Sequence, residues 1–426
     1  MAKRAAAAPA KKPKQPAGRG APSRRPAATK PLEYNILLTA TLCLLAAGAV
    51  MVYSASSART VLQGSGAGTG YLVRYLIYAA IGLGAMTMIS RRGLDSLVRW
   101  TGPLLAVSFA GLVAVRLPGI GVSINGAQRW IGAGPLQFQP SELAKIALVL
   151  YAVKFLAEKP KRVRSPRLLM PLLGVVGMAC LLVASQPDLG TALVVAFTLI
   201  CLLIAAGMPM RHLLTGIAVG VVLVALFALV EPYRRARLTS FLDPWAHAST
   251  SGFQSVQGQI ALGSGGISGV GLGQSVQKIF YLPEAHTDFI LAVVGEELGL
   301  IGLSALLFLY GLIAYAGLRV AQKARGAYAQ LLAAGVTSLI LCQALLNVFT
   351  VLGIAPLTGV PLPFISYGSS NLLVLLMGMG LLLNIADGGR VSLKVVEGSR
   401  DAGRHRSGRN GGARGAGPGG RRRAAG

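Results

Sequence analysis

The chain has 426 residues, of which 53% are hydrophobic and 13% charged, and its formal net charge is +27. This balance excludes an ordinary soluble enzyme, in which about a quarter of the residues are charged. The positive charge is concentrated at the two ends, with nine Lys or Arg in residues 1–30 and ten in residues 388–426. The composition predicts a membrane protein whose basic ends are attracted to anionic lipid headgroups, in preference to nucleic acid.

The two tails are rich in Ala, Gly, Pro and Arg and show neither helical nor strand periodicity. Segments with so few large apolar residues cannot bury enough surface to fold. We therefore expect disordered basic cytoplasmic tails at residues 1–31 and 391–426, on either side of an ordered domain at residues 32–390.

Ten apolar stretches of the ordered domain are long enough to cross a bilayer, allowing for kinks and tilt. Because lipid offers the backbone no hydrogen-bond partners, each stretch must be a helix. The predicted fold class is an all-α polytopic membrane protein with about ten transmembrane helices. In chain order the predicted spans are 36–54, 71–89, 100–116, 141–157, 168–184, 190–207, 211–230, 288–317, 329–352 and 368–387.

The orientation of the spans follows from Lys and Arg, which accumulate in cytoplasmic loops. When both tails are placed on one side, that side holds 31 of the 41 basic residues. We therefore predict that both termini are cytoplasmic and that a large outer loop at about residues 231–287 separates spans seven and eight.

The outer segments carry the unusual chemistry, because eight of the 14 acidic residues lie on or near this side. The stretch EAHTDFILAVVGEELG, where the large outer loop enters the eighth span, contains Glu284, His286, Asp288, Glu296 and Glu297. Ionisable groups at the edge of a bilayer or inside it cost several kcal/mol unless they are partnered. Such a cluster indicates a functional site at the outer face.

The outer location also restricts the chemistry, because no nucleotide pool exists there to drive a reaction. An enzyme on this side needs a substrate that arrives activated. The chain has no G-x-x-x-x-G-K-[ST] motif, and GSGGISGVGLG lacks the strand–helix context of a dinucleotide site. There are no His or Cys pairs with zinc spacing, and the four cysteines lie in apolar runs, so neither a metal site nor a disulfide framework is predicted.

The large outer loop contains one further helical pattern. Phe253, Val256 and Ile260 recur at helical spacing with glutamines between them. This predicts a short amphipathic helix lying in the outer interface. Such a helix could guide a lipid-linked substrate, or it could simply cover the helix bundle.

Several segments resemble motifs of the SEDS family (shape, elongation, division and sporulation). They are NGAQRWI, QPSELAK, QPDLGT, PEAHTDFILAVVGEELG and PLPFISYG, spread over residues 32–390. LPGIGVSINGAQRWIG and NVFTVLGIAPLTGVPLPFISYG are more similar to the division branch of the family than to its elongation branch. The chain departs from the usual SYGGSS at SYGSSN, where the side chain of Ser369 leaves less room for a close backbone approach.

The resemblance implies a bacterial peptidoglycan glycosyltransferase that polymerises lipid II, a disaccharide-pentapeptide on undecaprenyl pyrophosphate, at the outer face of the cytoplasmic membrane. It also implies a class B penicillin-binding protein transpeptidase and divisome proteins as partners, and a location at the division septum. The resemblance makes no cofactor certain, and a divalent cation, Mg²⁺ or Mn²⁺, could offset the pyrophosphate charge. An elongation polymerase, a lipid II flippase and a non-catalytic scaffold for a transpeptidase stay open as alternatives.

The family's catalytic Asp corresponds to Asp288 in HTDFI. A sugar hydroxyl must lose its proton as it attacks an anomeric carbon, so a carboxylate within hydrogen-bonding distance can act as general base; a helix N-cap or a structural ion pair is the alternative. Glu284 and His286 could tune this base or bind sugar hydroxyls, or they could only shape the loop. Glu296 and Glu297 lie on other sides of the helix and are expected to hydrogen-bond neighbouring helices.

Three further candidates for substrate binding lie at the outer ends of predicted helices. Glu142 and Lys145 share a helix face and could line the substrate cavity or form a buried salt bridge. Asp188 begins a helix, where capping is the alternative role.

The remaining candidates would hold the pyrophosphate, because planar guanidinium groups suit phosphate oxygens. Arginines at the outer side run against the cytoplasmic bias, but they could also anchor helix ends. The candidates are Arg129 beside Trp130, Arg234 and Arg237.

Overall fold

The computed structural model describes residues 30–389, apart from residues 63, 65–67, 125–126, 134–135, 231 and 280. The predicted basic tails at residues 1–31 and 391–426 therefore lie almost wholly outside the described residues. The described part is mostly helical, and it also contains a short 3-10 segment, η1 (Pro160–Arg164), and a small sheet.

Each of the ten predicted spans coincides with a long helix. These are α1 (Leu32–Leu62), α2 (Gly70–Arg91), α3 (Leu94–Ala114), α4 (Pro140–Glu158), α5 (Pro166–Ser185), α6 (Leu189–Ala205), α7 (Met210–Val230), α10 (Ile290–Lys323), α11 (Ala327–Val351) and α12 (Ser369–Ala386). Among the described helices, seven are long and apolar enough to cross a membrane, while α6 and α7 contain shorter apolar stretches and α4 is in neither group. The helical architecture is confirmed, and the number and orientation of the spans stay predictions.

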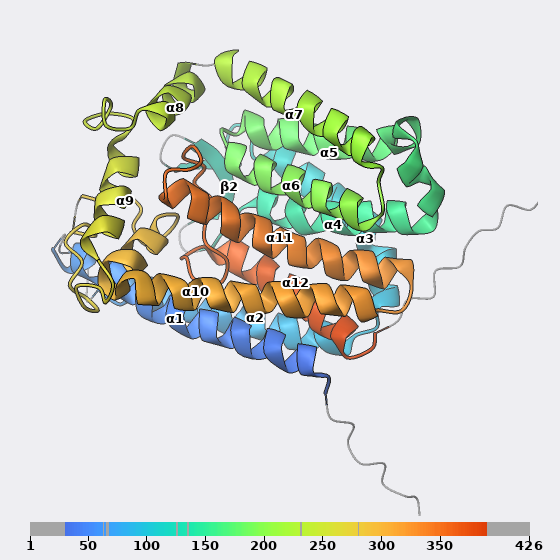
Figure 1. Ribbon diagram of the computed structural model, residues 1–426, viewed down its shortest axis with the longest axis horizontal. Helices are drawn as coiled ribbons and strands as arrows, with labels where there is room; N and C mark the ends of the chain where they lie inside the picture. Colours follow the sequence, from blue (N-terminus) through green and yellow to red (C-terminus); the bar gives the residue numbers. More distant parts are fainter. Residues whose placement is uncertain are drawn as a thin grey trace, which may run out of the picture.

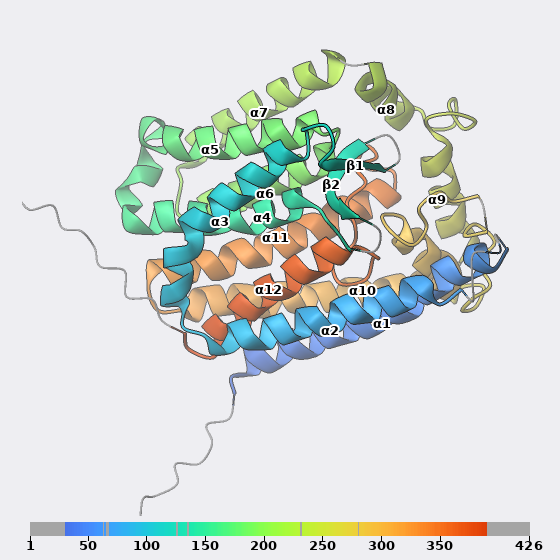
Figure 2. The same ribbon diagram turned by 180° about the vertical axis from the view of Figure 1, so that it is seen from behind.

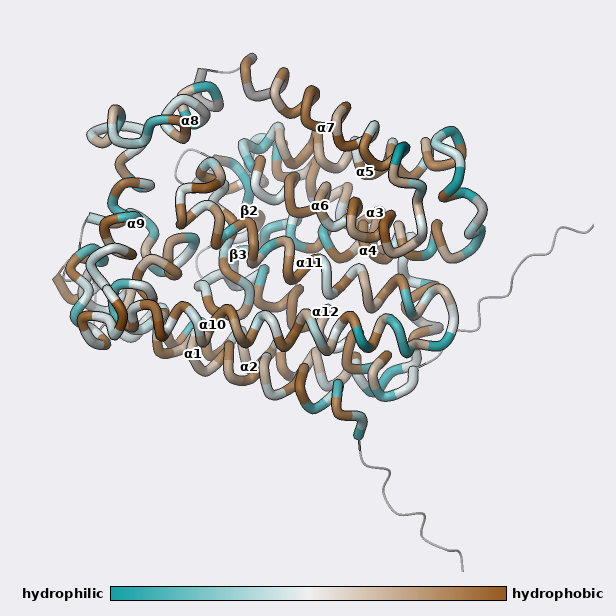
Figure 3. Tube along the Cα trace, viewed as in Figure 1, coloured by the Kyte–Doolittle hydropathy of each residue, from teal (hydrophilic) through white to brown (hydrophobic). Residues whose placement is uncertain are grey.

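The long helices run roughly side by side (Figure 1). α11 and α12 lie in the middle, with α1 and α2 along one edge and α5 and α7 along the other, as both views show (Figures 1 and 2). The described chain begins and ends at one end of the bundle, while α8 (Pro232–Leu242), α9 (Phe253–Ser264) and the sheet lie at the opposite end. Figure 3 shows hydrophobic residues along the helices, with hydrophilic residues gathered towards the two ends. We call the end that carries α8 and α9 the outer end.

Burial divides the helices into a central group and a peripheral group. Most residues of α4, α11 and α12 are buried, and α12 packs along α2 while α1 packs along α10. By contrast, α7 exposes consecutive apolar residues, including Val221, Val222 and Leu223. A helix that is apolar but exposed suits contact with lipid, whereas the central helices are enclosed by other helices.

The predicted helical class holds, and the outer segment between α3 and α4 adds a three-stranded antiparallel sheet that the sequence analysis did not predict. Its strands are β1 (Gly121–Ile124), β2 (Ala127–Ala133) and β3 (Leu136–Phe138), in the order β1-β2-β3. Val122 pairs with Trp130, and Ile131 pairs with Phe138. The backbone of this segment has no helical partners, so the strands satisfy one another's N–H and C=O groups. The sheet presents Arg129 and Trp130 at the outer end.

α9 confirms the predicted short helix but not its predicted apolar face. The helix packs against α10 and α11 and buries Val256, Gly258 and Ala261, whereas Ile260 is exposed. A Cβ atom on Gly258 would come within 2.6 Å of the Phe289 ring, so a side chain there would displace one or the other. α9 therefore packs directly against the residue at the N-cap of α10.

Candidate active site

A polar cavity of about 480 Å³ lies at the outer end of the bundle. Its wall is formed by the outer ends of α1, α2, α4, α6 and α12, by β2 and β3, and by the loops before α10 and α12. We call it the outer cavity. Seven of the predicted site residues line it: Arg129, Trp130, Glu142, Asp188, Glu284, His286 and Asp288.

Asp288 lies in the loop before α10, which begins at Ile290, two residues later than the predicted span. Its side chain is half-buried and lines the outer cavity. Asn347 of α11 holds the backbone there, because its Nδ2 donates to the carbonyl oxygens of Asp288 and Val360, both at 2.7 Å. Thr287 Oγ1 donates to Asp288 Oδ1 at 3.2 Å. The carboxylate is therefore fixed in direction while it faces the cavity.

Burial raises the pKa of Asp288 to about 6, and the negative charge of Glu284 acts in the same direction. Hydrogen bonds from its own backbone N–H and from Thr287, together with the positive charge of Arg237, oppose this rise. A carboxylate with such a pKa is mostly ionised at neutral pH and accepts a proton more readily than a solvated Asp. These properties suit a general base.

Glu284 and His286 flank the cavity in the same loop. Glu284 has a left-handed backbone conformation, with φ of 54°, which an L side chain rarely adopts. The His286 ring contacts Tyr71 and Tyr367 at centroid distances of 4.4 and 5.7 Å, and its carbonyl oxygen accepts the N–H of Tyr367 at 3.0 Å. The Glu284 carboxylate and the His286 ring of this loop therefore share one wall of the cavity with the rings of Tyr71 and Tyr367.

Arg74 is a cavity residue that the sequence analysis did not select. It lies near the start of α2, is exposed, lines the outer cavity and hydrogen-bonds the side chain of Tyr367. Its position within a predicted span hid it among apolar neighbours. A signal was present, since an arginine close to the outer end of a span runs against the cytoplasmic charge bias.

Glu142 and Lys145 form a buried ion pair on α4, with Lys145 Nζ 2.8 Å from Glu142 Oε2. The same Nζ donates to Gln343 Oε1 of α11 at 2.7 Å, and Asn371 Nδ2 of α12 donates to Glu142 Oε2 at 2.7 Å. Glu142 lines the outer cavity, whereas Lys145 lies away from its wall. With its hydrogen bonds to Gln343 and Asn371, the pair joins three central helices. Because only Glu142 reaches the cavity wall, Lys145 can affect the cavity through Glu142, and its predicted direct contact with substrate stays a prediction.

The start of α12 accommodates the SYGSSN departure. Ser369 lines the outer cavity, and its Oγ donates to the carbonyl oxygen of Gln137 at 3.4 Å. The Oγ of Ser370 accepts the N–H of Gln139 at 3.0 Å. The extra side chain at position 369 therefore lies at the cavity wall next to β3.

Asp188 caps α6 and also lines the cavity. Its Oδ1 accepts the N–H of Thr191 at 3.2 Å, and its Oδ2 accepts a hydrogen bond from Gln139 Nε2 at 3.1 Å, so the alternative role of helix capping is confirmed, while substrate binding stays a prediction. Arg129 of β2 donates to two backbone carbonyl oxygens of the turn just before Asp188, those of Gln186 and Pro187. Arg129 thus stabilises this turn at the same time as it lines the cavity.

Arg237, another of the predicted arginines, is not among the residues that line the cavity. Arg237 of α8 donates to the carbonyl oxygen of Leu357 at 3.1 Å. It acts on the site through its charge, which lowers the pKa of Asp288. The Arg234 side chain lies outside the described residues, so its predicted role stays a prediction.

Glu296 and Glu297 lie outside the cavity wall and accept hydrogen bonds from elsewhere in the chain. Glu297 accepts from Ser54 of α1, which confirms the predicted contact with a neighbouring helix. Glu296 binds residues 275–277 of the outer loop instead of a helix.

Comparison with known protein families shows to which family the chain belongs. Residues 35–390 match the model of the FtsW, RodA and SpoVE proteins, which is described as "Cell cycle protein". The chain belongs to the FtsW/RodA/SpoVE family. The match covers nearly the whole described part of the chain and confirms the resemblance to the SEDS motifs.

Curated relatives support this membership. Stage V sporulation protein E of Bacillus subtilis is 41% identical over 82% of this chain and 96% of its own length. The probable peptidoglycan glycosyltransferases FtsW of Coxiella burnetii and Geobacter sulfurreducens are 41% and 38% identical, over 82% of this chain and 95% and 94% of their lengths.

Solved structures of the FtsW/RodA/SpoVE family share the fold. A chain from a structure described as "Structural coordination of polymerization and crosslinking by a peptidoglycan synthase complex" has a TM-score of 0.66 and 31% identity, covering 82% of this chain and 96% of its own. Thermus thermophilus RodA has a TM-score of 0.60 and 30% identity, covering 82% and 95%.

The described part of this FtsW/RodA/SpoVE protein holds no group of three or more His, Cys, Asp or Glu side chains that could bind a metal ion. The cavity carboxylates Glu142 and Asp188 already accept hydrogen bonds from Asn371 and Gln139. A divalent cation that arrives with the pyrophosphate needs only one or two carboxylates, so its involvement stays a prediction, and the steps below use the side chains of the chain alone.

Proposed function

We propose that this chain is a peptidoglycan glycosyltransferase that polymerises lipid II in the outer cavity, with Asp288 as general base. The observation that carries this proposal is a half-buried carboxylate of raised pKa on the wall of a polar cavity at the outer end of a membrane bundle. Relatives named as probable peptidoglycan glycosyltransferases, 38–41% identical to the chain, support the reaction class.

The transfer joins two lipid-linked sugars in one displacement. The acceptor sugar hydroxyl gives its proton to an Asp288 carboxylate oxygen as its own oxygen bonds to the anomeric carbon of the donor. The bond between that carbon and the pyrophosphate oxygen breaks, and undecaprenyl pyrophosphate leaves with the electron pair. Proton transfer to a positioned base contributes about a hundredfold to ten-thousandfold to such a reaction.

The leaving pyrophosphate needs positive charge, and two arginines on the cavity wall can supply it. Arg74 is exposed to the cavity and keeps donors beyond its bond to Tyr367. Arg129 is half-buried and uses two donors on backbone carbonyl oxygens, so it offers fewer to a ligand. We therefore assign the main pyrophosphate contact to Arg74, with Arg129 supporting the turn beside it.

The test is polymerisation of purified lipid II by the purified full chain, with and without a class B transpeptidase. We expect glycan strands on gels and one undecaprenyl pyrophosphate released per bond formed. Addition of Mg²⁺, Mn²⁺ or a chelator shows whether a cation accompanies the substrate.

A different outcome would favour the flippase. If the chain forms no strands under any of these conditions but moves labelled lipid II between the leaflets of vesicles, the polymerase proposal is wrong. The position of the cavity argues against this, since transporters hold their ionisable residues near the bilayer midplane. A scaffold with neither activity would leave the half-buried Asp288 carboxylate without a role.

The pH dependence of polymerisation tests the base more directly. Asp288 must be ionised to accept a proton, so kcat/KM should fall about tenfold per pH unit below about pH 6. Initial rates between pH 4.5 and 8 measure this limb. A rate that stays constant down to pH 4.5 would contradict the assignment, because a carboxylate with this pKa would then be mostly protonated.

The proposed cellular role is septal cell-wall synthesis with a transpeptidase partner. Relatives named FtsW support the division role, and one similar chain comes from a peptidoglycan synthase complex that coordinates polymerisation and crosslinking. We propose a class B penicillin-binding protein and divisome proteins as partners in the bacterial cytoplasmic membrane. An elongation role is the second candidate, because RodA shares the fold.

A further inference from the structure

α10 is interrupted near its outer end, and a loop occupies the interruption. Gly299 has a left-handed φ of 61°, which breaks the helical backbone after Glu297. The freed carbonyl oxygens of Glu296 and Glu297 accept the N–H groups of Val270 and Gly271 at 3.0 and 3.1 Å. The two N–H groups of α10 that follow the break donate to loop carbonyl oxygens at 3.0 and 3.2 Å. The loop after α9 is therefore bonded to α10 through its backbone.

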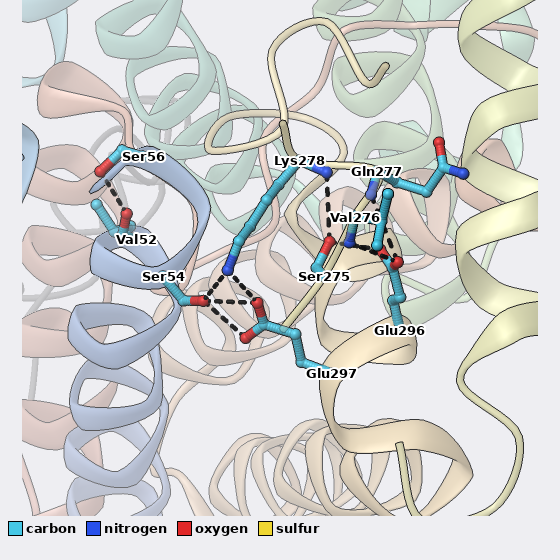
Figure 4. Close-up of polar contacts among 9 residues, drawn as sticks. All are labelled: Val52, Ser54, Ser56, Ser275, Val276, Gln277, Lys278, Glu296 and Glu297. Atoms are coloured by element: carbon cyan, nitrogen blue, oxygen red, sulfur yellow. Dashed lines mark hydrogen bonds and ion pairs between the residues drawn. The ribbon is translucent and has the colours of Figure 1, made fainter. Parts of the chain in front are cut away.

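The Glu296 carboxylate extends this attachment along the loop (Figure 4). Its Oε1 accepts the N–H groups of Val276 and Gln277 at 3.0 and 3.4 Å, and its Oε2 accepts the hydroxyl of Ser275. Charge-assisted hydrogen bonds of this kind are stronger than neutral ones. They fix the loop up to the residue before Lys278.

Lys278 then joins the loop to two helices (Figure 4). Its Nζ lies 2.6 Å from Glu297 Oε1 of α10 and 3.0 Å from Ser54 Oγ of α1. Ser54 Oγ in turn lies 2.7 Å from both carboxylate oxygens of Glu297. The side chains of the ion pair are 2% and 0% exposed. We call Ser54, Lys278 and Glu297 the Lys278 cluster.

The segment 279–288 leads from this cluster to the candidate base. Lys278 holds its first end, and the fully buried Phe289 follows its last residue. Leu282 is buried between them. Lys278 and residues 284–288 line the outer cavity, so both ends of this stretch lie at the cavity wall.

We propose that the Lys278 cluster positions Asp288 for catalysis by fixing the entry of segment 279–288 to α10 and α1. This inference rests on the proposed function of Asp288. Release of one end of a loop gives it more conformations. A base displaced by about 1 Å from the proton it accepts can lose about a hundredfold in rate. We class Lys278, Glu297 and Ser54 as positioning residues because the Lys278 Nζ is paired with Glu297 and Ser54, although Lys278 also lines the cavity.

The test removes both charges together, because either charge left alone would be buried without a partner. In Lys278→Met/Glu297→Gln we expect kcat for lipid II polymerisation to fall about tenfold to a hundredfold, with KM changed by less than about twofold. Hydrogen exchange should increase in segment 279–288. The matched control is Glu33→Gln/Lys323→Met, which removes an ion pair at the opposite end of the bundle. We expect it to change neither kcat nor the hydrogen exchange of segment 279–288.

Two results would overturn the proposal. One is unchanged kcat together with unchanged exchange in segment 279–288. The other is a large fall in Tm with increased exchange throughout the helices, which would make the cluster a general support of the fold. Hydrogen exchange does not depend on activity, so it tests the attachment of segment 279–288 even if the parent chain forms no glycan strands. Failure of the parent chain to form strands would contradict the proposed function and not the attachment.

Discussion

Replacing Asp288 with Asn should lower lipid II polymerisation at least about a hundredfold while the chain stays folded. Asn keeps the shape of the side chain and the backbone contact with Asn347, but it cannot accept the proton. Because the pKa of Asp288 is raised in the folded state, folding favours its protonated form, and its contribution to stability is lost as the pH rises through about 6. The neutral Asn should therefore leave Tm at pH 7 unchanged or slightly higher.

Glycan-strand formation, lipid II binding and Tm are measured for this variant beside Asp387→Asn. Asp387 is exposed at the C-cap of α12, whereas the outer cavity is lined by residues at the N-terminal end of this helix, so the same chemical change there should affect none of the three quantities. Near-normal polymerisation by Asp288→Asn would remove this residue from the mechanism. A collapse of Tm would show that its role is structural.

Lys145→Met should destabilise the chain by about 3–5 kcal/mol, because it leaves the buried Glu142 carboxylate without its cation. Adding Glu142→Gln removes that stranded charge and keeps a side chain that can hydrogen-bond Asn371. The double variant should therefore regain most of the lost stability. Thermal unfolding of both variants and the parent in one detergent measures this recovery.

Polymerisation by the same double variant separates the two roles of the ion pair. Glu142 lines the outer cavity, so we expect activity to stay low although the fold recovers. If activity returns with stability, the pair only supports the helices and Glu142 makes no contact with substrate. A single substitution cannot decide this, because it changes stability and the cavity together.

The sequence by itself determined which segments are helical and at which end of the bundle the chemistry lies. An apolar run in lipid has no alternative to a helix, and each of the ten predicted spans coincides with one. The order of the spans then brings their alternate ends together, so outer segments distant in sequence had to meet. Seven predicted residues share the outer cavity for this reason. The motifs around Asp288 and Glu142 also sufficed to indicate the family.

The tertiary structure alone decided how side chains within those segments are used. An apolar span gives little periodicity, so the sequence could not tell that Arg74 faces the cavity or that Lys145 faces Gln343. Short extended segments beside a membrane carry a weak pattern, and the sheet was missed.

The Lys278 cluster shows the same limit most clearly. Ser54 and Glu297 are 243 residues apart, and their contact exists because α1 packs along α10 at the level where Gly299 interrupts the helix. Local sequence sets the conformation of each helix, because backbone hydrogen bonds connect near neighbours. The rotation and depth at which two helices pack depend on all the side chains between them, and that packing selects the partner of every buried charge.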